Sequence, residues 1–214
     1  MKKNIIIIGM GQGLSMGIAE HFGKEGFHIG MMSRSAEKLA DFQAQLAEKG
    51  ITSEFVAADV ADTAQMIEAI HTLQSKMGTI DVLQYNAVDY RMNPLMSETA
   101  DTLTTGFRIS VANALAATQT LLPDLKSVKG AVLLTGGGSG NHPNPNMASI
   151  SLGKAGIRNL AVQLNEVLKA EGVYVGTLTI GGWIQPESET HSPKILAEKF
   201  WELYQNRNQV EVIY

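Results

Sequence analysis

The chain has 214 residues, 44% of them hydrophobic, and a formal net charge of -4. This length fits one domain, residues 1–214, with a substantial core, and the lack of a basic block argues against nucleic acid as a main partner. Because the sequence contains no cysteine, disulfides, thiolate metal sites and a cysteine nucleophile are excluded. The apolar runs are too short for a signal peptide or a membrane span, so we expect a soluble, cytoplasmic protein without a membrane partner.

The first stretch with a functional signature is residues 4–17. Residues 5–8 are four isoleucines, a β-branched run typical of a strand buried on both faces of a parallel sheet. Gly9, Gly11 and Gly13 follow directly, and apolar residues at helical spacing then predict a helix that begins at about Gly13. A strand, a glycine turn and a helix N-terminus form an anion site, which a dinucleotide pyrophosphate commonly occupies. The alternative is a plain structural turn.

The next segment bears on the choice of dinucleotide. Residues 27–32 predict a second strand, Ser33 and Arg34 follow it, and residues 36–49 have a helical pattern. The loop after the second strand of a dinucleotide fold meets the adenosine ribose, where an acid accepts hydrogen bonds from a 2′-hydroxyl and an arginine pairs with a 2′-phosphate. This loop has an arginine and no carboxylate, so we expect NADP(H) in preference to NAD(H). A solvated loop arginine is the alternative.

The remaining segments alternate between strand and helix patterns. We expect strands at residues 53–58, 80–84, 131–134 and 173–180, and helices at residues 63–76, 103–122, 149–170 and 194–207. Asp59, after the third strand, could cap the next helix or bind adenine, and residues 89–101 read as a polar loop. The pattern predicts an α/β fold: a single-domain, doubly wound Rossmann fold with a mainly parallel sheet of six or seven strands and helices on both faces. Residues 185–214 are expected to add a short substrate-side loop, helix and tail.

Several short motifs, in this order and spacing, resemble the short-chain dehydrogenase/reductase family over nearly the whole chain up to about Pro186. They are Gly9-x-x-x-Gly13-x-Ser15, Asp59-Val60, Asn86-Ala87, Thr118-Gln119 with Pro123, Lys154 and Gly181. The resemblance implies an NADP-dependent oxidoreductase that acts on a carbonyl or alcohol substrate. The expected cofactor-binding residues are Gly9, Gly11, Gln12, Gly13, Leu14, Ser33, Arg34, Asp59, Val60, Asn86, Ala87, Thr135, Lys154, Gly181, Gly182 and Ile184.

The catalytic residues that the resemblance implies are mostly replaced in this chain. The family uses a serine, a tyrosine and lysine spaced Y-x-x-x-K, and an asparagine on the preceding helix. Lys154 stands at the lysine position, but Ile150 replaces the tyrosine, Gly137 the serine and Ser110 the asparagine, with Asn113 one turn away. Residues 131–170 contain no tyrosine that a small shift of the alignment could bring into place.

Other groups near these positions are candidates for the missing acid. His142 has a suitable pKa range, although a histidine in such a polar loop is commonly solvated. Ser149 and Ser151 lie at a helix start, where serines usually cap. Lys154 is expected to hold the cofactor ribose, and the scattered histidines predict no metal site.

Two functional hypotheses therefore remain open: an oxidoreductase with a remodelled site, and a catalytically inactive dinucleotide-binding sensor or scaffold protein. If nothing replaces the acid, we expect no appreciable reduction of common ketones and aldehydes. We also expect a homodimer or homotetramer, because two long helices carry more apolar residues than one sheet face should cover. These residues are Leu115, Ala116, Leu121, Leu122, Ile157, Leu160, Leu164 and Leu168.

Overall fold

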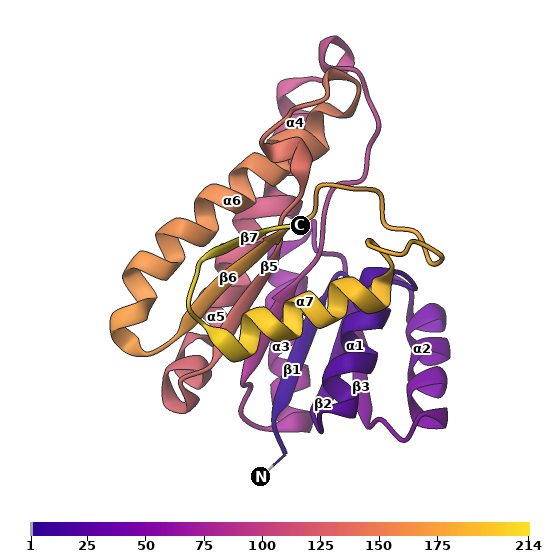
Figure 1. Cartoon of the computed structure of the whole chain (residues 1–214), viewed down its shortest axis with the longest axis vertical. Helices are drawn as coiled ribbons and strands as arrows, with labels where there is room; N and C mark the ends of the chain where they lie inside the picture. Colours follow the sequence, from indigo (N-terminus) through magenta and orange to yellow (C-terminus); the bar gives the residue numbers. More distant parts are fainter. Residues whose placement is uncertain (1) are drawn as a thin grey trace.

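A seven-stranded sheet forms the centre of the computed structural model, which describes residues 2–214 (Figure 1). The strand order is β3-β2-β1-β4-β5-β6-β7, and all six neighbouring pairs are parallel. The strands are β1 (Asn4–Ile8), β2 (His28–Ser33), β3 (Ser53–Ala57), β4 (Val82–Tyr85), β5 (Ala131–Thr135), β6 (Tyr174–Thr179) and β7 (Glu211–Ile213). The predicted doubly wound parallel fold is confirmed, and the apolar tail supplies the seventh strand.

Helices cover both faces of this sheet. One face packs against α1 (Leu14–Lys24), α2 (Ala36–Glu48) and α7 (Pro193–Asn206), and the other against α3 (Thr63–Met77), α5 (Asn113–Val128) and α6 (Ala148–Leu168). Along β1, Ile5 and Ile7 point into the first core while Ile6 and Ile8 point into the second. All four side chains are fully buried, which is why the strand reads as a continuous apolar run. Within residues 2–214, the helices are all too short or too polar to cross a bilayer.

The helix expected at residues 103–122 is divided into three parts. α4 (Ala100–Phe107) leads into a π-helical segment, Arg108–Ala112, and then into α5. The expected end near Pro123 was wrong, because α5 continues to Val128 with the proline inside it. Leu121 and Leu125 lie on either side of Pro123 and are both fully buried, so core packing outweighs the backbone hydrogen bond that proline removes.

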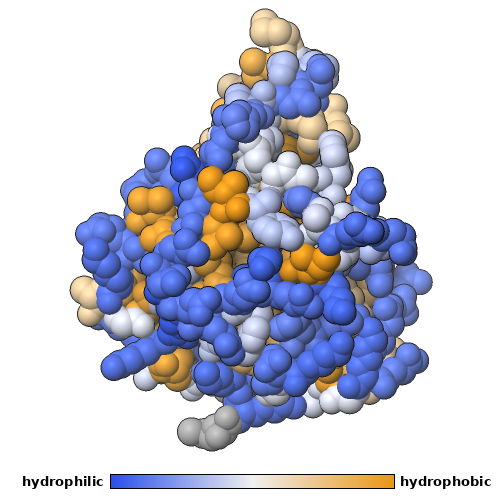
Figure 2. All heavy atoms as spheres, in the orientation of Figure 1, coloured by the Kyte–Doolittle hydropathy of each residue, from blue (hydrophilic) through white to orange (hydrophobic). Residues whose placement is uncertain are grey.

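The residues on which an oligomer was predicted are partly core residues. Leu121, Ile157, Leu164 and Leu168 are all buried within one chain. Other apolar side chains of α4, α5 and α6 are exposed instead, namely Phe107, Leu115, Leu152, Val162 and Val167. Figure 2 also shows hydrophobic residues at the narrow end of the molecule that carries α4 in Figure 1.

Most of residues 185–214 belong to the main fold. α7 packs against α1 so closely that a Cβ at Gly17 would lie 2.5 Å from the Pro193 carbonyl oxygen. Trp201 and Tyr204 of α7 make ring contacts with Phe22 of α1. β7 extends the sheet beside β6, so only residues 181–192 remain as a loop at the edge where the strands end.

The contact at Gly17 leads to a stability prediction. Gly17→Ala should gain up to about 1 kcal/mol of helix propensity and lose about 1–3 kcal/mol to overpacking, because the obstructing atoms belong to the backbone. We therefore expect a net loss of stability in urea denaturation. Gly11→Ala is the control, because a Cβ there would meet no atom within 4 Å. A Gly17→Ala variant as stable as the wild type would contradict the close α1–α7 packing.

Candidate active site

The glycine turn after β1 is fastened to the end of β4. Gly9 has a φ of 91°, and a Cβ at this position would lie 2.5 Å from the Ala87 backbone nitrogen, so no larger residue fits. The Ser15 hydroxyl donates to the Gly9 carbonyl oxygen at 2.9 Å, and the Asn86 side-chain amide donates to Ser15 Oγ at 2.7 Å. These contacts hold the turn and the end of the neighbouring strand in one arrangement.

The space above the next two glycines is open. A Cβ at Gly11 or at Gly13 would meet no protein atom within 4 Å. Gly13 is the N-cap of α1 and has no side chain to accept from the first helical N–H groups. An anion that enters this space would meet free N–H groups and the positive end of the helix dipole. The turn therefore fits a phosphate or pyrophosphate group.

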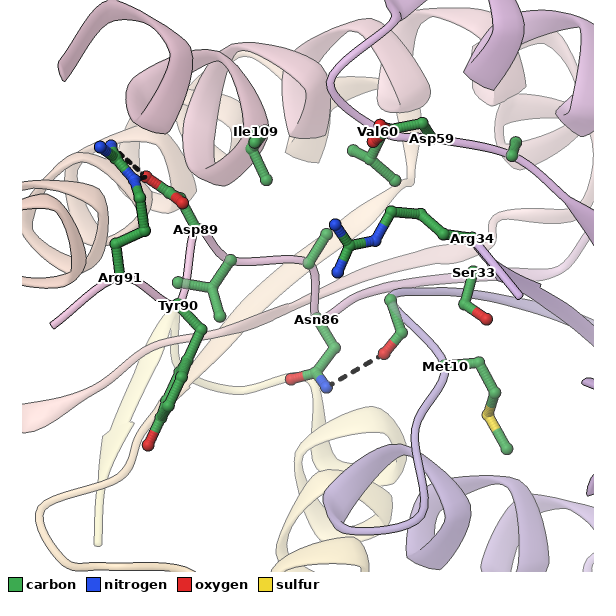
Figure 3. A pocket seen from close by; sticks show the side chains of 14 residues that line it. Met10, Ser33, Arg34, Asp59, Val60, Asn86, Asp89, Tyr90, Arg91 and Ile109 are labelled. Atoms are coloured by element: carbon green, nitrogen blue, oxygen red, sulfur yellow. Dashed lines mark hydrogen bonds and ion pairs between the residues drawn. The ribbon is translucent and has the colours of Figure 1, made fainter. Parts of the chain in front are cut away.

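A cleft of about 480 Å³ lies beside this turn, at the carboxyl ends of β1 to β4 (Figure 3). It brings together seven of the predicted cofactor residues: Gly9, Ser33, Arg34, Asp59, Val60, Asn86 and Ala87. The Arg34 side chain reaches into the cleft, and it forms no ion pair with any residue in the range 2–214 (Figure 3). The arrangement leaves a free positive charge at the β2 side of the cleft.

An adjoining hollow lies on the other side of Arg34. It is lined by Gly11, Gln12, Ser33, Arg34 and Lys38, among others, at the beginning of α2. Ser35 caps this helix, since its hydroxyl accepts from the Lys38 backbone N–H. Arg34 and Lys38 are both exposed. The sequence predicted only the cation of Arg34 here, and the structure adds Lys38 as a second one.

Asp59 does not cap α3, so that alternative was wrong. Asp62 is the N-cap and accepts from the Gln65 N–H at 3.0 Å. The Asp59 carboxylate instead accepts from the Ala61 N–H at 2.9 Å and faces the cleft. The Asn113 amide donates to the Val60 carbonyl oxygen at 2.5 Å. Asn113 therefore supports the loop after β3 from the start of α5.

The other predicted cofactor residues do not line this cleft. Leu14 is in the core, while Gln12 and Gly13 border a hollow between α1 and the start of α7. Gly181 donates its N–H to the Tyr214 carbonyl oxygen, and the His191 ring packs over Gly182. Gly181, Gly182 and the partly exposed Ile184 belong to the loop after β6. Thr135 is buried at the end of β5.

Lys154 reaches the end of β5 from α6. Its Nζ donates to the Thr135 carbonyl oxygen at 2.7 Å, and its methylene groups pass 3.1–3.2 Å from the place of a Cβ on Gly137. Burial lowers the pKa of Lys154 to about 8. One turn earlier on α6, Ile150 is buried and carries no proton to donate.

Comparison with known proteins identifies the family. The model of the short chain dehydrogenase family matches residues 3–191. The chain belongs to the short-chain dehydrogenase family. Three curated relatives are similar: Oxidoreductase asL5 of Sarocladium schorii (27% identity over 83% of this chain and 70% of that protein), Oxidoreductase UcpA of Escherichia coli K12 (28%, 88% and 72%), and the 3-oxoacyl-[acyl-carrier-protein] reductase FabG of Staphylococcus aureus (28%, 85% and 74%).

Solved structures share the fold at lower sequence identity. Acetoin dehydrogenase from Enterobacter cloacae superimposes with a TM-score of 0.91 at 20% identity, over 100% of this chain and 94% of that one. A metagenomic short-chain oxidoreductase in complex with NADP gives a TM-score of 0.88 at 19% identity, over 99% and 95%. At these identities the likeness shows a common Rossmann-like fold.

Ser110, at the position where the resemblance places the family's asparagine, lies in the π-helical segment Arg108–Ala112. Ser110 is buried there, and its hydroxyl accepts from the Asp89 backbone N–H at 3.1 Å. The Tyr85 hydroxyl donates to the Ile109 carbonyl oxygen at 2.5 Å, and burial raises the pKa of Tyr85. The Ser110 hydroxyl thus holds the loop after β4 at Asp89, and the Tyr85 hydroxyl holds the backbone of the segment at Ile109.

The candidate replacements on the β5–α6 loop and at the α6 start lie outside the cleft. His142 is exposed, and its side chain has no hydrogen-bond partner among the described residues. Ser149 and Ser151 do not cap α6, so that expectation was wrong: Ser149 donates to Asp89 at 2.6 Å, and Ser151 accepts from the Asn144 N–H at 3.1 Å. The hydroxyls of both serines hold loops against the helix.

Three residues that the sequence analysis assigned to a polar loop line the cleft: Asp89, Tyr90 and Arg91. Arg91 donates to Asp89 at 2.7 Å, to Glu98 at 3.1 Å and to the Thr102 carbonyl oxygen at 2.8 Å. Burial alone would raise the pKa of Asp89, but hydrogen bonds from Arg91 and Ser149 and the charge of Arg91 lower it below its usual value. In the sequence, the opposite charges of Asp89 and Arg91, two residues apart and shortly after Asn86-Ala87, could have indicated this ion pair.

The ion pair predicts a pH-dependent loss of stability in Arg91→Met. The variant leaves the Asp89 and Glu98 carboxylates poorly solvated and without their cation. Removing one partner of a fully buried ion pair lowers the free energy of unfolding by about 3–5 kcal/mol. Because Arg91 is partly exposed, we expect a loss of about 1–3 kcal/mol here. In the wild type, the lowered pKa of Asp89 makes the pairing stabilising above the ordinary carboxylate pKa, and this stability is lost as the pH falls through the folded value.

Urea denaturation at several pH values measures this effect. The cost of Arg91→Met should be largest near pH 7 and should shrink below about pH 4, where the carboxylates protonate. Arg158→Met, which breaks the more exposed pair with Glu211, is the control and should cost about 1 kcal/mol or less. An equal cost of Arg91→Met at neutral and acid pH would contradict the assigned ion pair.

Proposed function

We propose that this short-chain dehydrogenase binds NADP(H) and transfers a hydride between the cofactor and a carbonyl or alcohol substrate, with a proton donor that differs from the family pattern. The observation that carries the cofactor assignment is Arg34, whose unpaired guanidinium enters the cleft from the loop after β2. This loop, Ser33 to Ser35, contains no carboxylate that would select a 2′-hydroxyl.

The residues of the cleft fit each part of the cofactor. Gly11 and Gly13 would hold the pyrophosphate in the open space at the N-terminus of α1. Arg34, with Lys38 behind it, would pair with a 2′-phosphate, and Asp59-Val60 would border the adenine. Lys154 would hold the second ribose at the end of β5, near Thr135. When bound, NADPH supplies the hydride, and the protein orients the carbonyl and provides the proton.

Support for NADP also comes from the metagenomic oxidoreductase with the same fold, which was solved in complex with NADP. The substrate class is the one that the family resemblance implies, and several curated relatives are named as oxidoreductases. The alternative function, an inactive dinucleotide-binding sensor or scaffold protein, is favoured by Ile150 and Gly137, because neither side chain can donate a proton.

The cofactor assignment predicts tighter binding of NADPH than of NADH. Arg34→Ala should remove about 1–3 kcal/mol of this preference, the scale of a charge-assisted hydrogen bond, and should leave NADH affinity nearly unchanged. Fluorescence titration of both nucleotides measures the two affinities. Lys169→Ala, which removes a positive charge at the far end of α6, is the control. Equal affinity of the wild type for NADPH and NADH would overturn the assignment.

A homodimer or homotetramer remains a prediction, now based on different residues. Phe107 of α4 and Leu152 of α6 are about half exposed and line an apolar hollow between these helices. Burial of such side chains against a second copy would remove them from water. Light scattering at micromolar concentration should show an oligomer, and Leu152→Glu should shift it toward monomer. A monomeric wild type would contradict the prediction.

A further inference from the structure

The loop that follows β4 presents its side chains to two different sides. Asp89 and Arg91 point together toward α4 and α6, where they meet Ser149 and Glu98. Tyr90 lies between them and points to the opposite side of the loop, the side on which Asn86 lies (Figure 3). Tyr90 is therefore an aromatic side chain in the lining of the cleft, at the end beyond Asn86.

The backbone on both sides of Tyr90 is held in place. The Asp89 N–H donates to Ser110 Oγ, and the Asp89 carboxylate accepts from Ser149 and from Arg91. Arg91 adds a hydrogen bond to the Thr102 carbonyl oxygen and an ion pair with Glu98, whose side chain is 1% exposed. With both neighbours fixed, the Tyr90 backbone is held at this end of the cleft, and the ring moves by rotation about its own side-chain bonds.

Tyr90 combines an available hydroxyl with a place in the lining of the cleft. Its side chain is 63% exposed, and its hydroxyl has no hydrogen-bond partner in the part of the chain that the structure describes. Tyr85 and Tyr174 are buried and donate to the carbonyl oxygens of Ile109 and Gln209. Tyr204 is buried and accepts from Lys3. Tyr214 is partly buried and its hydroxyl also has no partner among residues 2–214, but its ring lies beside His191 and Lys199 on the α7 side and does not line the cleft.

A cation lies at the neighbouring strand end. β4 and β5 pair with Tyr85 opposite Leu134, so the next residue of β5, Thr135, ends its strand beside the start of the loop that carries Tyr90. Lys154 Nζ is bound to the Thr135 carbonyl oxygen and has no carboxylate partner among residues 2–214. A cation therefore lies at the strand end next to the one that the Tyr90 loop follows, where the proposed function places the second ribose of the cofactor.

From this geometry we propose that Tyr90 is the proton donor of the reduction, in place of the tyrosine that residue 150 lacks. The proposal rests on the proposed NADP(H)-dependent function. The carbonyl carbon receives the hydride, the carbonyl oxygen receives the proton from Tyr90 Oη, and the products are the alcohol and the oxidised dinucleotide. Tyr90 is left as a phenolate and regains its proton from solvent, to which it is open. In the reverse direction the same phenolate accepts the proton of the alcohol.

Steady-state NADPH oxidation over a panel of ketones and aldehydes tests the donor role. Tyr90→Phe keeps the ring and removes the hydroxyl, so kcat should fall about 100-fold or more, the usual effect of losing a general acid. The NADPH dissociation constant should stay within about threefold, because the hydroxyl is not needed for cofactor binding. Tyr174→Phe is the matched control: it removes the same group from a buried tyrosine and should leave kcat unchanged.

A second measurement does not depend on turnover. Nitration by tetranitromethane, located by mass spectrometry, should modify Tyr90 readily in the free protein, because Tyr90 is 63% exposed whereas Tyr85, Tyr174 and Tyr204 are buried; the partly buried Tyr214 should react more slowly. NADP⁺ should protect Tyr90, since the proposed donor lies against the bound cofactor. In the Tyr90→Phe background, Ile150→Tyr with Gly137→Ser should restore part of kcat. A Cβ at Gly137 would meet only the flexible stem of Lys154, so the Gly137→Ser change is expected to be tolerated.

The outcomes separate this inference from the function on which it rests. Wild-type turnover that survives in Tyr90→Phe, or that is lost in His142→Ala, would overturn the donor role and leave the NADP(H)-dependent function standing. NADPH binding without any turnover on the panel, or without protection of Tyr90, would also overturn it and would favour the inactive binding protein. Failure to bind NADPH at all would instead overturn the proposed function.

Discussion

The contact on which the site depends is the close approach of Gly9 to the end of β4. A Cβ on Gly9 would lie 2.5 Å from the Ala87 backbone nitrogen, so only a residue without a Cβ allows this approach. Ser15 and Asn86 then fix this approach with hydrogen bonds. As a result, the start of the glycine turn, the cation of Arg34 and the loop after β4 face one cleft. The cofactor half of the molecule therefore follows from a backbone constraint at one residue.

The region around Lys154, at the end of β5, departs from the family pattern. Ile150 is buried where the resemblance places an acid, and the stem of Lys154 passes over Gly137, where it places a serine. The network that joins Asp89, Arg91 and Glu98 instead stabilises the loop after β4 and leaves Tyr90 free. Asp89 remains ionised because two donors lower its pKa, so it acts as an anchor for Arg91 and not as an acid. In the function proposed here, dinucleotide binding and proton donation would depend on separate sets of residues.

The fold could be predicted from sequence because each strand of the parallel sheet is a local apolar run and each helix has its own period. The β-branched run of β1 and the glycines after it are adjacent in the chain, so the turn could also be predicted. The continuation of α5 through Pro123 could not be predicted, because the helix tolerates this proline only through the packing of Leu121 and Leu125 against distant residues. The roles of Ser149 and Tyr90 were missed for the same reason. Each is set by a partner or a cleft about sixty residues away in the chain, such as Asp89 for Ser149.

The most direct test of this account is a crystal structure of the protein with NADPH. We expect the pyrophosphate at the N–H groups of Gly11 to Leu14, the 2′-phosphate against Arg34, and the Tyr90 hydroxyl facing the nicotinamide end with Lys154 on the adjoining ribose. A complex in which Arg34 makes no contact with the 2′-phosphate and Tyr90 points away from the nicotinamide would contradict it.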